Sequence, residues 1–155
     1  MGYGVIESNE DEIAVIDYGG LVSKECFQIG ERLNYFYGEL RKIIQRHQPD
    51  GVAVEQPFVA KNVRTALAIG RAQAVALLAA ATDKIPSFEY TPARIKQMVA
   101  NYGASGKEQI QEMVRLQLGL TEVPQPDDAA DALAVAICHL REVHVNNLLT
   151  GQGGV

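Results

Sequence analysis

Judged by its apolar runs, the sequence is expected to contain no hydrophobic stretch long enough to cross a membrane. Its longest apolar run, Ala72–Ala81, is interrupted by Gln73, whereas a spanning helix needs about 20 predominantly apolar residues. The chain also opens directly into Tyr3–Ile6, without the basic and then hydrophobic leader of a secretory signal. We therefore expect no membrane association and a cytoplasmic location.

Cysteine is scarce, which excludes two further classes of protein. Cys26 and Cys138 are the only cysteines, and their separation matches neither a disulfide framework nor a thiolate zinc site. We expect both to be reduced and buried, as is usual for thiols in a cytoplasmic protein.

An overall basic charge is also absent, although the charge is unevenly distributed. The net charge is −5, yet residues 56–119 carry eight bases and four acids, so that this segment is +4 and the remainder is −9. Local field rather than total charge attracts a polyanion. The segment is compatible with nucleic-acid binding and equally with an ordinary solvated surface.

The order of hydrophobic patterns predicts an α/β protein with a mixed sheet. We expect one domain over residues 1–147 and a flexible tail over 148–155. Strands are expected at 3–6, 13–16, 51–55 and 85–90, and helices at 29–47, 62–83, 91–101, 107–118 and 127–143.

One carboxylate stands at the end of an apolar strand. Glu55 follows Gly51–Val54 and precedes Gln56-Pro57, so it is expected at the rim of the sheet, where open α/β folds place their sites. A carboxylate there is costly unless it is paired or bound to a cation. Chance placement at a strand end explains it equally well.

Three more acids open the last helix. Asp128 and Asp131 are three residues apart and share a helix face, and Asp127 precedes them among alanines. Acids at a helix N-terminus compensate the dipole, so capping and metal binding are equal alternatives. As a group, Glu55, Asp128 and Asp131 offer hard oxygen ligands suited to Mg²⁺ or Mn²⁺. A pair of such ions about 4 Å apart would hydrolyse a phosphodiester by activating water and stabilising the leaving oxygen.

Four ordered motifs make the chain resemble the RuvC-type Holliday-junction resolvases. They are Glu55-Gln-Pro-Phe-Val-Ala-Lys-Asn62, Tyr90-Thr-Pro-Ala-Arg-Ile-Lys-Gln97, Gly106-Lys-x-Gln-x-Gln-x-Met-Val114 and Asp128-Ala-Ala-Asp-Ala-Leu-Ala134. The resemblance implies an RNase H-like mixed β-sheet flanked by helices, and a nuclease domain. It further implies a homodimer that makes paired cuts in four-way junction DNA, and a partnership with the RuvAB branch-migration motor.

The resemblance also implies roles for particular residues. Glu55, Asp128 and Asp131 would bind two Mg²⁺ or Mn²⁺ ions, and Lys107 would act with them in catalysis. Phe58 would stack near unpaired bases at the crossover. The long helix after Glu55 would form the dimer interface, with small residues permitting close approach. The DNA-binding residues would be Phe58, Lys61, Asn62, Arg64, Arg94, Lys96 and Lys107.

The chain departs from the family pattern at its start. The family's first strand, Gly-x-Asp-x-Gly, supplies another metal-binding aspartate and lies centrally in the sheet, whereas Gly2–Ile6 already resembles the second strand. Asp17 lies in a segment that resembles the missing motif. Its position, after the segment that resembles the second strand, argues against its being the missing metal ligand. We expect Met1 to be an internal start, and the present chain to cut feebly or to act as a catalytically dead junction-binding module.

Overall fold

The structure is a computed structural model that describes residues 1–9, 11–57, 62–101 and 106–151. In these ranges the strands are β1 (Gly2–Asn9), β2 (Glu12–Gly20), β3 (Val52–Glu55) and β4 (Ser87–Tyr90). The helices are α1 (Ile29–His47), α2 (Val63–Thr82), α3 (Pro92–Ala100), α4 (Lys107–Gln117) and α5 (Asp127–Leu149). The expected α/β order is confirmed.

The strands form two small sheets. β1 and β2 make an antiparallel hairpin with a register shift between Val5 and Ile6, whereas β3 and β4 are parallel and pair Glu55 with Tyr90. Across the described ranges no ladder joins the two sheets. Both pairing types of the expected mixed sheet are therefore present.

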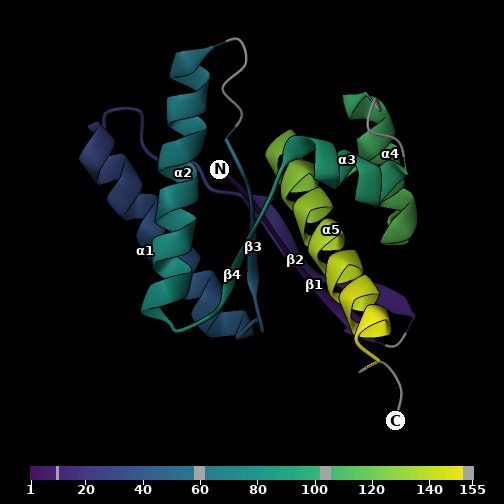
Figure 1. Cartoon of the computed structure of the whole chain (residues 1–155). Coiled ribbons are helices and arrows are strands. Elements are labelled where there is room, and N and C mark those ends of the chain that lie inside the picture. The colour runs from purple at the N-terminus through teal and green to yellow at the C-terminus, as the bar shows by residue number, and fades with distance from the viewer. Residues whose placement is uncertain (10, 58–61, 102–105, 152–155) are drawn as a thin grey trace.

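The helices cover the strands from two sides, and Figure 1 shows α1 and α2 on one side and α5 with α3 and α4 on the other. The Arg41 guanidinium on α1 donates to both carboxylate oxygens of Asp83, at 3.0 and 2.9 Å. Asp83 caps the C-terminus of α2, and this bidentate pair lowers its pKa. The α1–α2 pair is thereby fixed beside β3.

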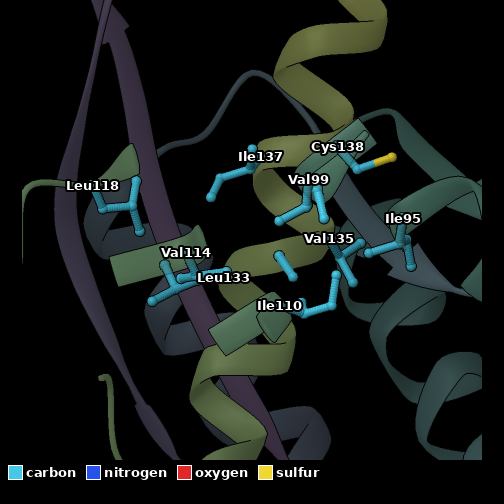
Figure 2. Close-up of a cluster of buried hydrophobic side chains, with 11 residues drawn as sticks. Ile95, Val99, Ile110, Val114, Leu118, Leu133, Val135, Ile137 and Cys138 are labelled. Atoms are coloured by element: carbon cyan, nitrogen blue, oxygen red, sulfur yellow. The ribbon is translucent and has the colours of Figure 1, made fainter. Parts of the chain in front are cut away.

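The main hydrophobic core surrounds α5. Val99, Val114, Leu133 and Ile137 are fully buried, and Figure 2 shows these side chains gathered where α3 and α4 meet α5. Such a core comes from the periodic apolar face of each helix.

Small residues bring β1 and α5 into close contact. Ala129 and Ala130 on α5 are 0% and 1% exposed. A Cβ added at Gly2 would lie 2.0 Å from the backbone oxygen of Asp128, far inside van der Waals contact. The two elements can approach this closely because neither carries a larger side chain there.

Two sequence-based expectations are wrong. The last helix was expected to end at Val143, but it continues to Leu149, because residues 144–149 contain neither proline nor glycine. The segment 148–155 is therefore helical at its start, and residues 152–155 lie outside the described part. Cys26 was expected to be buried but is exposed, since it lies in the connection between β2 and α1, away from the core. Cys138 is buried as expected, and burial raises its pKa to about 11.

Candidate active site

A cavity of about 240 Å³ opens where β3, α3, α4 and α5 meet. Its polar lining consists of two acids and two bases, Glu55, Asp131, Lys96 and Lys107. Its remaining wall is apolar and comprises Pro92, Ile95, Ile110, Ala134 and Val135. Four of the residues singled out from the sequence therefore face one space, although they are up to 76 positions apart in the chain.

The polar residues of the cavity come from different positions in their elements. Glu55 is the last residue of β3, and Lys107 is the first residue of α4. Lys96 lies in the middle of α3, which begins with the Thr91 side chain accepting from the Arg94 backbone N–H at 3.1 Å. That cap and Pro92 at the first helical position fix where α3 starts.

The environment of Glu55 disfavours its negative charge. The side chain is partly buried, and desolvation raises its pKa, as does the nearby charge of Asp131. Lys96 acts in the opposite direction and lowers the pKa. A carboxylate with a raised pKa beside a like charge is a common feature of functional sites.

Asp131 shows the same tendency. Although the residue as a whole is exposed, desolvation of its carboxyl raises its pKa, and Asp128 and Asp127 add to this effect. Lys107 lowers it. Two carboxylates whose charged forms are disfavoured by burial and by neighbouring acids would gain from a shared cation.

Asp128 is oriented differently from the other two acids. Its side chain is 65% exposed, and Oδ2 lies 3.8 Å from the amino group of Met1. Asp128 does not line the cavity, although it shares a helix face with Asp131. In the part of the chain that the structure describes, no three His, Cys, Asp or Glu side chains are grouped closely enough to hold a metal ion. The donor chemistry of Glu55 and Asp131 fits a hard divalent cation, and the third carboxylate lies just outside their cavity.

The residues expected to bind DNA are placed unevenly. Asn62 caps α2, where its side chain accepts from the backbone N–H groups of Arg64 and Thr65 at 3.1 and 3.3 Å. Arg64 is exposed at the same helix end. Arg94 is paired with Glu142 and also donates to Gln97 at 3.0 Å. Its charge is therefore largely compensated within the protein. Phe58 and Lys61 lie outside the described residues.

Asp17 does not join the candidate site. It lies on β2, where Oδ2 is 3.0 Å from Nε2 of His47 and Oδ1 accepts from the Tyr3 hydroxyl at 3.3 Å. These partners hold it away from the cavity that Glu55 lines. This agrees with the spacing argument against Asp17 as a substitute ligand.

One residue at the cavity rim was given no role from the sequence. Asp127 forms an ion pair with Lys107, with 3.6 Å between Oδ2 and Nζ. The sequence marked Asp127 only as one of three acids at a helix start. No sequence signal joins it to Lys107, because the contact exists only once α4 and α5 pack together.

Comparison with known proteins yields one family. Residues 1–139 match the model described as crossover junction endodeoxyribonuclease RuvC. A protein of that description from Dehalococcoides mccartyi is 57% identical over 153 residues, covering 99% of this chain and 92% of the relative. One from Chloroflexus aggregans is 54% identical over 139 residues, covering 90% of this chain and 85% of the relative.

Solved structures agree with this result. Thermus thermophilus RuvC superposes with a TM-score of 0.84 at 30% identity, covering 94% of this chain and 89% of that one. The same protein in complex with a Holliday junction substrate gives 0.87 at 29% identity, covering 94% and 88%.

Proposed function

Because the chain belongs to the RuvC family of crossover junction endodeoxyribonucleases, we propose that it resolves four-way DNA junctions by metal-assisted hydrolysis of phosphodiesters at the cavity. One observation carries the assignment of the site. Glu55, Asp131, Lys96 and Lys107 come from four separate elements and line the same space. Acids that can hold cations beside bases that can hold phosphates are what this reaction needs.

We assign metal binding to Glu55, Asp128 and Asp131. Carboxylate oxygens favour Mg²⁺, with Mn²⁺ as the alternative, and a pair of ions would serve. When bound, the metal supplies an activated water and stabilises the leaving oxygen of the phosphodiester. The pKa values of Glu55 and Asp131, raised mainly by burial and further by neighbouring acids, support this role, because a bound cation stabilises the charged form of both carboxylates.

The bases around the cavity have a different role in this proposal. Lys96 and Lys107 would contact the phosphate at the cut, since both line the cavity, and Lys107 would act there in catalysis. Asn62 and Arg64, at the start of α2, would contact the DNA backbone. Phe58 and Lys61, which lie between Glu55 and Asn62 in the sequence, would also contact the junction DNA. Arg94 would contribute less than its charge suggests, because Glu142 already neutralises it.

Cleavage of a synthetic four-way junction tests this function. The chain should cut the junction in Mg²⁺ and only bind it in EDTA. Glu55→Gln should abolish cutting and leave binding in EDTA largely intact, because it removes a ligand charge and almost no volume. Glu7→Gln, at an exposed position of β1, is the matched control and should cut normally. Retained cutting by Glu55→Gln would refute the role given to Glu55.

The catalytically dead binding module is the alternative, and the family relationship does not favour it. The same experiment separates the two. Structure-selective binding by the wild-type chain without cutting in Mg²⁺ or Mn²⁺ would support the module. Absence of binding at low salt would contradict both.

The same proposal includes a homodimer formed through α2. This helix has a mean hydropathy of 1.4 over an 18-residue window of which only 22% is buried. Contrary to the expectation from its interrupted apolar run, the helix is long and apolar enough to cross a membrane by length and composition alone. An exposed apolar helix face equally suits a protein interface. Val63, Leu67 and Leu78 are 65%, 56% and 58% exposed on it. Ala66 is buried within the chain, so it cannot contribute to that face, whereas Ala68 is exposed.

Sedimentation of two charge variants tests the dimer. Leu67→Glu should shift the chain from dimer to monomer, because it places charge in the middle of the α2 face. Leu116→Glu is the matched control, since Leu116 on α4 is 55% exposed and lies away from α2. A monomeric wild-type chain at micromolar concentration would contradict the dimer. Cooperation with the RuvAB motor and a cytoplasmic location complete the proposal.

A further inference from the structure

The pair formed by Asp127 and Lys107 has features that stability does not explain. Their side chains are 55% and 59% exposed, with 3.6 Å between Oδ2 and Nζ. Exposed ion pairs contribute little to folding, at most about 1 kcal/mol. Lys107 is also the first residue of α4, and a cation is unfavourable at the positive end of a helix. The dipole of α4 therefore disfavours a lysine at this position.

The position of the pair relates it to the cavity. Lys107 lines the cavity, whereas Asp127 does not, so the acid holds the base from outside. Lys107 is close enough to Asp131 to lower its pKa, and Asp127 is close enough to raise it. An ammonium group has three donors, so an ion pair with Asp127 leaves others for a phosphate above the carboxylates.

We propose that Asp127 is a positioning residue that holds the Nζ of Lys107 at the rim of the cavity, ready to contact the phosphate that is cut. Lys107 has a long, flexible side chain, and ordering it during the reaction costs entropy. A partner that orders it beforehand raises the rate rather than the affinity. This inference rests on the proposed function, because it assigns Asp127 a part in the same reaction.

Asp127→Asn should slow cutting without weakening binding. Single-turnover cutting should slow about two- to fivefold, the factor that an exposed pair can supply. Junction binding in EDTA should stay the same or tighten, because a negative charge near the phosphates is gone. A general structural defect would weaken both. Asp127→Glu should restore most of the rate, and Glu108→Gln, an exposed acid beside Lys107 on α4, should change neither the rate nor the affinity.

A double-mutant cycle determines whether Asp127 acts through Lys107. In a Lys107→Met background, followed over long times with enzyme in excess, Asp127→Asn should have no further effect on the rate. An unchanged rate in the single variant Asp127→Asn would overturn the proposal. An equal loss of rate in both backgrounds would overturn it as well.

A measurement without DNA separates this proposal from the function on which it rests. In an NMR spectrum of the metal-free protein, the two Hε protons of a held Lys107 should have distinct shifts, and they should merge in Asp127→Asn. Signals that are the same in both proteins would overturn the positioning role even if the wild-type chain cuts junctions. A wild-type chain that neither binds nor cuts a junction would refute the function, and the Hε signals would still decide whether Asp127 holds Lys107.

Discussion

The close approach of β1 to α5 makes Gly2→Ala a sharp test of how the candidate site is positioned. A Cβ at residue 2 would lie 2.0 Å from the carbonyl oxygen of Asp128 and 2.7 Å from the backbone nitrogen of Ala129. Both are backbone atoms of the first turn of α5, which a rotamer change cannot move. The strand end cannot simply swing aside, because the amino group of Met1 donates to the Leu21 carbonyl at 3.0 Å and the Leu21 N–H donates back at 2.6 Å.

The size of the effect follows from these distances. Ordinary contact for a Cβ begins at 3.4 Å, so β1 and α5 must separate by about 1.4 Å at this point. Overpacking of this kind costs about 1–3 kcal/mol of folding free energy. The same movement displaces the helix start that carries Asp128 and Asp131 from Glu55 on β3, and a misplacement of about 1 Å can slow a reaction about 100-fold. We therefore expect a larger loss of cutting than of stability.

Single-turnover cutting and urea unfolding of the same preparations measure the two effects. Gly38→Ala is the matched control, because a Cβ there meets nothing within 4 Å. It lies inside α1, where alanine is favoured over glycine by about 0.5–1 kcal/mol. This control should be slightly more stable and cut normally. If Gly2→Ala instead matched the wild type in both measurements, the close packing of β1 on α5 would be wrong.

Two of the three remaining predictions concern Glu55, and the third concerns Leu133. Because the pKa of Glu55 is raised in the folded state, this group stabilises the fold below its unfolded pKa, and that contribution is lost as the pH rises through the folded pKa. In EDTA, Glu55→Gln should therefore be more stable than the wild type at pH 7 and lose this advantage near pH 4. Urea unfolding at both pH values measures the difference. A variant less stable than the wild type at pH 7 would contradict this prediction. Mg²⁺ should raise the unfolding temperature of the wild type and have less effect on Glu55→Gln, and equal shifts would argue against a ligand role. Leu133→Ala should cost about 2–5 kcal/mol, because Leu133 is fully buried at the centre of the core; a loss below about 1 kcal/mol in a urea titration would contradict that packing.

Sequence patterns predicted the helices well because each has local signals. Thr91 and Pro92 set the start of α3 and Asn62 that of α2, as capping chemistry requires. The start of α5 at Asp127 was also predicted, whereas its end was placed too early, because an exposed helix end without a breaker leaves little trace in the sequence. The strand bounds were less accurate, since pairing along a hairpin extends strands past their apolar residues.

The sequence alone singled out the residues to which we assign the chemistry: the carboxylates Glu55, Asp128 and Asp131 and the bases Lys96 and Lys107, in motifs that a linear pattern can reveal. Only the tertiary structure decided how they meet. It placed Glu55 and Asp131 in one cavity, turned Asp128 toward the amino group of Met1 and joined Lys107 to Asp127. Residue type and spacing are local properties of a chain, whereas a distance between two helices depends on the packing of every side chain between them.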